Sequence, residues 1–307
     1  MNSSISNFKA FAIAFIALFS LSTLGFIIGS ELLIRFHVAP GNSYDALKRA
    51  FHSNHDVSVA FGDSRAVSGI LEDSGFTNFA AAGESLETTL GKLNAYVASR
   101  RGRHVLLQIG PQHFSFYRLS LEQSDLLEDF LDTEPRSLQI LRPHFRRYLF
   151  DYWNAVLRDP ARLFIEPEKT TSSEPTAMPR VREMSADARR RQATIRTQLH
   201  IPVPGYAATA DMKRLRDTLE RTRDAGVTLC LVTFPVSSAY RDAAGYFPIF
   251  NHIRASYSAL AEDIGITYVD LWDAYGDDYF GNVDHLNGDG ARRLSGDLRR
   301  ACKSGGS

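Results

Sequence analysis

The stretch Val57-Ser-Val-Ala-Phe-Gly-Asp-Ser-Arg-Ala66 decides how the rest of the chain is interpreted. It is a short apolar run with β-branched residues that breaks at Gly62-Asp63-Ser64, and a helix can begin at Arg65. This pattern predicts a buried strand that presents Ser64 at a sharp turn. A strand fixes the position of the hydroxyl, and the backbone N–H groups of the turn point to where an oxyanion would form. Ser64 is therefore a candidate nucleophile, although Gly-Asp-Ser also ends ordinary strands.

Apolar strands and helices alternate along much of the remaining chain. Beyond the strand that ends at residue 61, we expect strands at 76–82, 104–109, 227–234 and 265–270. We expect helices at 44–51, 85–100, 208–225 and 249–263, and a last one that opens within 284–291 and runs to about 302. Continuous apolar strands between helices are typical of a parallel sheet covered on both faces. The sequence thus predicts an α/β fold with a doubly wound, five-stranded parallel sheet and ligands at the carboxyl ends of its strands.

Residues 113–205 interrupt this alternation and form a predicted helical and mobile insertion. Residues 120–164 have the pattern of amphipathic helices rich in aromatic side chains, which we expect to pack on the α/β domain. A lid, a glycan-facing wall or a surface near the bilayer is the alternative. Residues 166–199 are rich in polar and charged side chains and are expected to be mobile.

The N-terminal region has the composition of a membrane anchor. Residues 10–30 carry no charge and are long enough to cross about 30 Å of hydrocarbon as a helix. No small-x-small cleavage site follows a short apolar core, which favours a retained anchor over a cleaved signal peptide. Lys9 precedes the run and Arg35 follows it. We place the N-terminus inside and the main domain on the periplasmic or extracellular side of the cytoplasmic (inner) membrane, with residues 1–36 as anchor and 37–307 as the α/β domain.

Composition excludes some classes of function. The chain has 35 basic and 35 acidic residues, so no net field attracts nucleic acid. It has no paired Cys/His spacing for a metal and no Walker or dinucleotide glycine motif, so we expect neither a metal nor a cofactor. Cys230 lies in an apolar run and is expected to be a buried, small hydrophobic residue, whereas Cys302 lies in a basic tail. Whether the two cysteines pair stays open.

Polar residues that follow the strands form the candidate site. They are Gly62-Asp63-Ser64, Gly83-Glu84-Ser85, Gly110-Pro111-Gln112-His113 and Asp284-His285. In a doubly wound sheet these loops open on one edge, so distant residues converge. His285 can serve as base for Ser64, while the N–H groups of Ser64 and Gly83 and the amide of Gln112 can bind the oxyanion.

Two charged residues beside the candidate nucleophile have other expected functions. Asp63 is expected to cap the following helix or to hold the turn. Arg65 is placed to bind an anionic group.

These residues resemble the motifs of the SGNH (GDSL-like) hydrolase superfamily. Gly62-Asp63-Ser64, Gly83, Gly110-Pro111-Gln112 and the segment around His285 correspond to its successive blocks. With one N-terminal anchor and the run Asp284-His-Leu-Asn-x-x-Gly-Ala291, the chain most resembles the membrane-anchored branch that acylates envelope polymers, such as alginate O-acetylation proteins and DltD. The resemblance implies a flavodoxin-like fold and serine-dependent O-acylation, mainly O-acetylation, of an envelope or exported polysaccharide. It also implies an acyl donor delivered by a multi-spanning membrane acyltransferase.

Two positions depart from the family pattern. Gln112 stands where the family has Asn; it keeps the amide donor but is one methylene longer. Asn282 stands where the family has Asp, and it cannot stabilise an imidazolium by charge. Asp284 can substitute, or the site can work as a Ser–His dyad. Two alternatives to acyl transfer therefore stay open: an esterase or deacetylase that uses the same residues, and a non-catalytic scaffold or glycan-binding component of an envelope assembly.

Overall fold

The structure is a computed structural model. It describes residues 3–38, 43–53, 58–99, 104–121, 123–133, 138–160 and 181–303. The chain divides into two compact units, one of residues 1–46 and 132–171 and the other of residues 47–131 and 172–307. The segment 113–205 is thus shared between both units. Helix α2 (Ser43–Ser53) passes from the first unit into the second.

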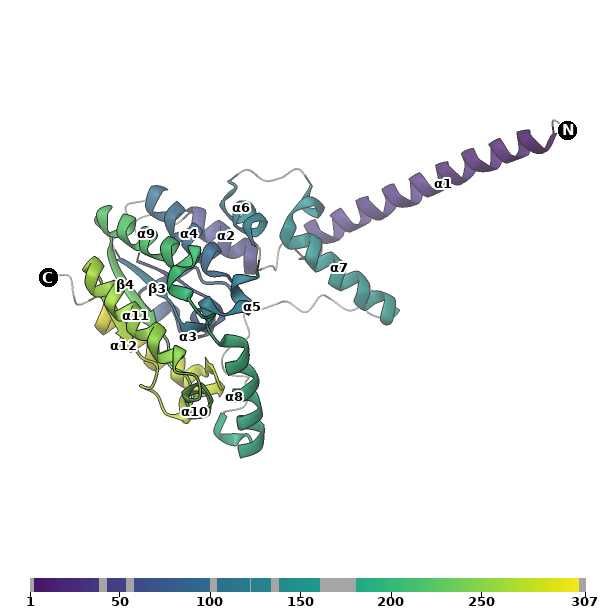
Figure 1. Cartoon of the computed structure of the whole chain (residues 1–307). Helices are drawn as coiled ribbons and strands as arrows, with labels where there is room; N and C mark the ends of the chain where they lie inside the picture. The colour runs from purple at the N-terminus through teal and green to yellow at the C-terminus, as the bar shows by residue number, and fades with distance from the viewer. Residues whose placement is uncertain are drawn as a thin grey trace. The chain divides into compact units, whose positions relative to one another are not determined.

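The second unit is built around a parallel sheet, which confirms the predicted α/β fold (Figure 1). Its strands are β1 (Val59–Phe61), β2 (Thr77–Asn78), β3 (His104–Gln108), β4 (Thr228–Thr233) and β5 (Thr267–Asp270). All pairings are parallel, in the order β2-β1-β3-β4-β5. Chain direction across the sheet reverses between β1 and β3. Ligands of such sheets bind at this switch point, outside the carboxyl ends of the strands.

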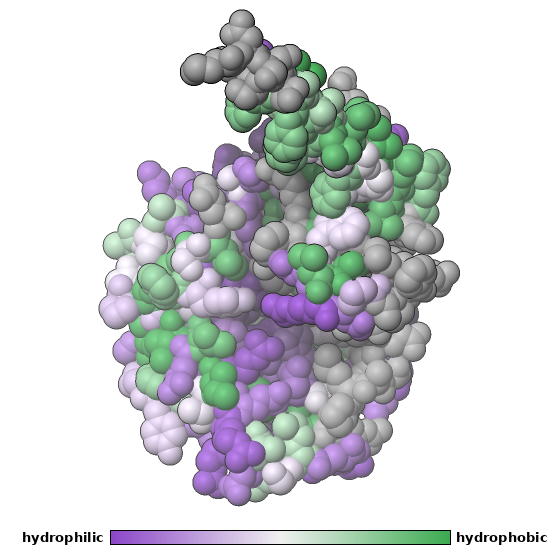
Figure 2. Space-filling view, turned by 90° about the vertical axis from the view of Figure 1, so that its right-hand side faces the viewer, coloured by the Kyte–Doolittle hydropathy of each residue, from purple (hydrophilic) through white to green (hydrophobic). Residues whose placement is uncertain are grey.

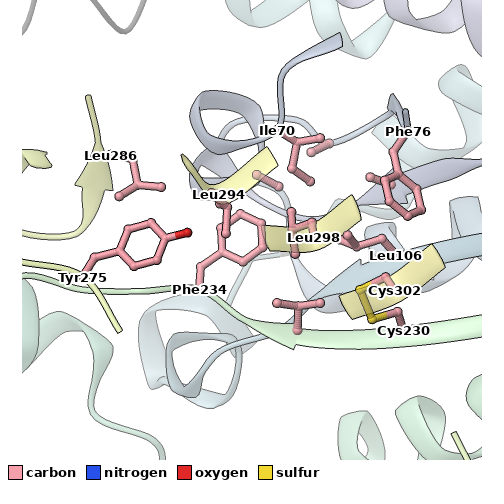
Figure 3. Close-up of a cluster of buried hydrophobic side chains, with 14 of the residues drawn as sticks. Ile70, Phe76, Leu106, Cys230, Phe234, Tyr275, Leu286, Leu294, Leu298 and Cys302 are labelled. Atoms are coloured by element: carbon pink, nitrogen blue, oxygen red, sulfur yellow. A yellow bond between two sulfur atoms is a disulfide. The ribbon is translucent and has the colours of Figure 1, made fainter. Parts of the chain in front are cut away.

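Helices cover both faces of the sheet. On one face, α3 (Ser64–Gly69) and α12 (Gly288–Lys303) share a buried core with the strands, which includes Leu294, Leu298 and Leu106 (Figure 3). The opposite face is covered by α4 (Leu86–Ser99), α9 (Ala210–Asp224) and α11 (Ile249–Ile264). There Phe61 of β1 contacts Tyr96 of α4, with 6.0 Å between ring centroids. The period of two along each strand sends alternate side chains into the two cores.

A disulfide bond joins Cys230 of β4 to Cys302 near the end of α12 (Figure 3). It resolves the pairing that the sequence left open, and both residues are buried, as expected for Cys230. The bridge fastens the last helix to the middle of the sheet. Disulfides of this kind persist in oxidising compartments outside the cytoplasm.

Two helices and a pair of strands differ from the expectations. Helix α8 (Ala186–His200) lies within the segment expected to be mobile, while residues 161–180 lie outside the described part of the chain. It forms because Ser185 caps its first turn by accepting from the Ala188 N–H, and Ala, Arg and Gln favour helix. Helix α10 (Ser238–Gly245) and the antiparallel pair β6 (Phe280–Asn282) and β7 (His285–Leu286) were not expected either.

Short helices complete the second unit around these elements. They are α5 (Phe116–Leu119), α6 (Ser124–Leu131) and the 3-10 turns at Glu72–Ser74, Pro111–Phe114, Val181–Glu183, Tyr206–Ala208 and Asp277–Tyr279.

The first unit contains the N-terminal helix α1 (Ser3–Leu33), which continues as a π-helical turn over Ile34–Val38. A stretch of 29 residues, Phe8–Phe36, has a mean hydropathy of 2.4 and is long and apolar enough to cross a membrane. Helix α7 (Pro143–Arg158) follows the 3-10 turn Gln139–Leu141.

The aromatic side chains of α7 correct one expectation. Phe145 packs on Ile34 in a small buried cluster, and the ring of Trp153 lies 5.2 Å from that of Phe26. Phe145 and Trp153 thus pack on the C-terminal end of α1 within the first unit, whereas Phe130 of α6, from the same predicted segment, packs as expected in the second unit, with 5.1 Å between its ring centroid and that of Phe51. The Glu31 carboxylate reinforces the packing on α1 because it accepts from the N–H of Ile140 at 2.9 Å.

Candidate active site

Ser64 is the first residue of α3 and directly follows the end of β1, at the switch point of the sheet. Asp63, in extended backbone conformation, is the N-cap of this helix, and its Oδ1 accepts from the Arg65 N–H at 2.9 Å. The capping bond expected for Asp63 is therefore present. It fixes the turn, and the Ser64 side chain remains half-exposed at the edge of the sheet.

Glycines at the ends of β1 and β3 make room for two glutamine side chains. A Cβ atom on Gly62 would lie 2.5 Å from Gln108 Oε1, and one on Gly110 would lie 2.3 Å from Gln112 Oε1. Gln108 Oε1 accepts from the Asp63 N–H at 2.9 Å. Glycine is needed at both strand ends because any larger residue would clash with the glutamine side chains, which hydrogen-bond to Asp63 and so hold the serine turn.

His285 reaches Ser64 from the other end of the chain. Its Nε2 lies 2.9 Å from Ser64 Oγ, which joins residues separated by 221 positions in sequence. His285 begins strand β7, and Asn282 ends β6, so the short antiparallel pair forms an arm that carries the imidazole. The two side chains that the sequence proposed as nucleophile and base are therefore hydrogen-bonded to each other.

The side chains of Asp284 and Asn282 both face Nδ1 of His285, but they have different structural roles. Nδ1 lies 3.2 Å from Asp284 Oδ1 and 3.1 Å from Asn282 Oδ1. The Asn282 oxygen also accepts from the backbone N–H groups of Asp284 at 3.0 Å and His285 at 2.8 Å. Asn282 therefore holds the backbone of the arm, while Asp284 brings a carboxylate to the imidazole.

The Asp284 carboxylate is ionised at neutral pH. Burial by itself would raise the pKa of Asp284, but the hydrogen bond to His285 and the charges of His285 and Arg65 lower it well below its usual value. Arg65 Nη2 lies 3.5 Å from Asp284 Oδ2, and Arg196 Nε of α8 lies 3.7 Å from Oδ1. A buried anion beside Nδ1 favours the tautomer in which Nε2 can accept the serine proton.

The guanidinium of Arg65 points inward and not to solvent. It is buried and donates to Gln112 Oε1 at 3.1 Å and to His200 Nδ1 at 3.4 Å. With Asp284 on Nη2, these contacts occupy the group that the sequence assigned to an anionic ligand. Arg65 thus links the serine helix, the third strand loop and the histidine arm.

Gln112 takes part in the same buried network. Its Nε2 donates to Asp63 Oδ2 at 3.0 Å while its Oε1 accepts from Arg65. These bonds hold the amide between two charged groups, and its predicted contact with an oxyanion stays a prediction.

Asp63 is the anion at the centre of that part of the network. Burial would raise the pKa of Asp63, but its electrostatic interactions with His113, Arg65 and Arg118 lower it well below its usual value. His113 Nε2 lies 3.8 Å and Arg118 Nη2 3.6 Å from Asp63 Oδ2.

Gly83 lies in the loop that follows β2. The Ala81 N–H donates to the Gly62 carbonyl at 3.2 Å, which places this loop beside the serine turn. Gly83 adopts φ +77°, a conformation that favours glycine, and its carbonyl accepts from Gln123 Nε2 at 2.9 Å. The oxyanion role of its N–H also stays a prediction.

Sequence reasoning did not identify the contribution of α8 and α10. His200 of α8 is buried, with Nδ1 2.9 Å from the hydroxyl of Tyr240 in α10, and Arg196 of α8 faces Asp284. Burial lowers the pKa of His200 to about 3, so the ring is neutral. Neither helix carries a motif, and only the fold brings them to the site.

Comparisons with known proteins give a sparse result. No family model matches the chain, and no curated protein matches it. Among solved structures, the chain is similar to the crystal structure of a Bacteroides fragilis protein described as a candidate acylhydrolase. The similarity covers 86% of this chain and 97% of that one, with a TM-score of 0.45 and 9% sequence identity. At these values the likeness does not bear on function, for which the geometry of the site is the basis.

Proposed function

We propose that this protein is a serine-dependent acyl-group enzyme that transfers an acyl group, most simply acetyl, to a hydroxyl of a cell-envelope or exported polysaccharide. One observation carries the proposal: Ser64 Oγ lies 2.9 Å from His285 Nε2, and the buried Asp284 carboxylate lies 3.2 Å from Nδ1 of the same ring. A hydroxyl, a base and an anion that orients the base are the parts that nucleophilic catalysis requires.

The reaction proceeds in two balanced halves. Ser64 Oγ attacks the carbonyl carbon of the acyl donor while its proton passes to His285 Nε2, and the imidazolium then protonates the leaving group. The result is an acyl ester of Ser64. In the second half a sugar hydroxyl gives its proton to Nε2 and attacks the carbonyl carbon of that ester; the bond to Ser64 Oγ breaks, the imidazolium returns the proton to Oγ, and the new sugar ester and the Ser64 hydroxyl result.

The negative charge that develops on the carbonyl oxygen of the acyl group must be stabilised by hydrogen-bond donors. The N–H groups of Ser64 and Gly83 are the proposed ones, because neither bonds to another atom within the described ranges of the chain. Asp284 stabilises the imidazolium that forms in both halves.

The setting of the reaction belongs to the same proposal. The apolar helix α1 is the membrane anchor, with the second unit on the outer side of the cytoplasmic membrane. The Cys230–Cys302 disulfide favours such an oxidising location. The acyl donor reaches Ser64 by way of a multi-spanning membrane acyltransferase.

Reaction of the full-length chain with a serine-directed fluorophosphonate tests the core of the proposal. We expect covalent labelling that maps to the peptide containing Ser64 and disappears in Ser64→Ala. Ser68, one turn further along α3, is a matched control, because its hydroxyl donates to the Ser64 carbonyl and Ser68→Ala should keep the labelling. A wild-type chain that is folded but unlabelled refutes an activated hydroxyl and leaves the scaffold as the better account.

A second measurement separates transfer from hydrolysis. With a chromogenic acetyl ester as donor, addition of an acceptor glycan should raise the turnover of the enzyme and yield an acetylated glycan. Release of acetate at a rate that no glycan changes would identify an esterase built on the same residues.

A further inference from the structure

A groove lies between α8 and α10 in the second unit. It encloses about 900 Å³ and is open to solvent. Its lining residues are Ala186, Arg189, Arg190, Thr194, Thr197 and Gln198 of α8, Ser238, Ala239, Asp242 and Ala243 of α10, and Tyr246, Phe247 and Asp277. Figure 2 views the molecule from the side on which α8 lies in Figure 1, and hydrophilic side chains gather on this face.

The α8 wall of the groove offers two unpaired cations. Neither Arg189 nor Arg190 forms an ion pair or a side-chain hydrogen bond with another residue of the described part of the chain. Arg182, in the turn that precedes α8, by contrast contacts Asp278 at 2.9 Å. Guanidinium groups without partners in a groove are suited to carboxylate or phosphate groups, which they bind in a bidentate manner.

The floor of the groove contains an unsatisfied hydroxyl. Thr197 is completely buried, and its Oγ1 has no hydrogen-bond partner. Buried hydroxyls without a partner are rare because they lose their hydrogen bonds to water. A ligand hydroxyl in the groove would supply the missing partner.

The α10 wall has the features of a sugar site. Tyr246 is 84% exposed, and an exposed aromatic ring can stack on the apolar face of a sugar. Asp242 is exposed on the same wall and can accept hydrogen bonds from sugar hydroxyls. Asp277 is already bound by the N–H and hydroxyl of Ser238, at 2.8 and 2.6 Å.

One end of the groove adjoins the candidate active site. The residue next to Thr197 is Arg196, whose Nε lies 3.7 Å from Asp284. On the other wall the N–H of Ser237, next to Ser238, donates to the Val283 carbonyl at 3.1 Å. Both walls therefore adjoin residues that contact the arm that carries His285.

We propose that the groove between α8 and α10 binds a segment of the acceptor glycan, and that this glycan carries acidic groups. The acceptor part rests on the proposed function. The acidic groups bind Arg189 and Arg190, while sugar hydroxyls bind Thr197 and Asp242 and one ring stacks on Tyr246. Carboxylate and phosphate substituents share this chemistry.

Binding to the full-length chain in detergent, without an acyl donor, tests the proposal. The probes are an oligogalacturonate, a mannose-phosphate oligomer and a neutral maltooligosaccharide of equal length, followed by calorimetry. We expect at least one acidic oligomer to bind about tenfold or more tightly than the neutral one. The acidic oligomer that binds, with carboxylate or with phosphate groups, identifies the acidic group of the ligand.

Variants connect the binding to the groove. The double variant Arg189→Gln/Arg190→Gln and the variant Tyr246→Ala should each weaken binding about tenfold or more. Arg191→Gln, on the same helix but outside the lining, is the matched control and should bind like wild type. The proposal is overturned by equal affinity for neutral and acidic probes, by no binding of any probe, or by equal losses in the control.

The outcome is independent of the chemistry at Ser64. Labelled Ser64 without glycan binding overturns the groove and keeps the enzyme. Glycan binding without labelling keeps a glycan site and removes the acyl-transfer step.

Discussion

Replacing Asp284 by Asn should slow the reaction of Ser64 about a thousandfold. The carboxylate lies 3.2 Å from Nδ1 of His285, and its ionised form stabilises the imidazolium that appears when Ser64 loses its proton. Two unit charges about 4 Å apart at an effective dielectric constant of about 20 interact by about 4 kcal/mol. Each 1.36 kcal/mol changes a rate about tenfold, so loss of this interaction corresponds to about three orders of magnitude.

The assay is the second-order rate constant for fluorophosphonate labelling of Ser64, measured near pH 8 with the full-length chain. The melting temperature of each variant is measured alongside, because Asp284 also pairs with the buried Arg65. Asp289→Asn is the control: this half-exposed carboxylate at the start of α12 bonds Arg292, and its loss should leave the labelling rate unchanged.

Asn282→Ala tests the alternative orienting group. This change removes the acceptor of two backbone N–H groups, so we expect a less stable arm and a smaller loss of rate than in Asp284→Asn. A loss of less than tenfold in a stably folded Asp284→Asn chain would refute the assignment of Asp284 and favour a Ser–His dyad.

Three further predictions concern stability, measured by chemical unfolding of the chain in detergent. Burial lowers the pKa of His113 to about 4 and of His200 to about 3 from 6.5, so only the unfolded chain takes up these protons at pH 5. Stability is therefore intact above pH 6.5 and falls by about 2 kcal/mol per histidine at pH 5, whereas a pH-independent free energy of unfolding would contradict the burial of neutral rings. Gly62→Ala should lower the free energy of unfolding by about 1–3 kcal/mol and slow labelling, because the new Cβ atom would lie 2.5 Å from Gln108 Oε1. Gly296→Ala is the control and should not destabilise the chain, because the nearest atom to its new Cβ is 3.7 Å away. Cys302→Ser should lower the free energy of unfolding by about 2–4 kcal/mol, and an unchanged value would show that the bridge contributes nothing.

The sheet could be predicted because its strands are short apolar runs bounded by glycine and polar residues. The same rule predicted the meeting of Ser64 and His285, since parallel strands end at one edge. Strand β2 is shorter than expected, at two residues against seven, although the N–H groups of Phe79 and Ala81 still donate to the carbonyls of Ala60 and Gly62 at 2.8 and 3.2 Å.

Other parts of the site could not be read from the sequence. Asp284 and Asn282 are both close enough to His285 along the chain to bind it, and only side-chain geometry shows which carries charge and which holds the backbone. Arg65 was expected to bind an anionic ligand because it is next to Ser64 in the sequence. Its position in the sequence does not show that its side chain is buried. His200 comes from a polar segment that lacks a strong apolar period, so its place in the network depends on tertiary packing.

The order in which the chain is synthesised gives the disulfide and the histidine arm a further meaning. The nucleophile is synthesised 221 residues before its base, and the helix that follows the base contains, near its end, the cysteine that bonds to Cys230. A partly synthesised chain therefore contains Ser64 before it contains the imidazole that the proposed reaction requires.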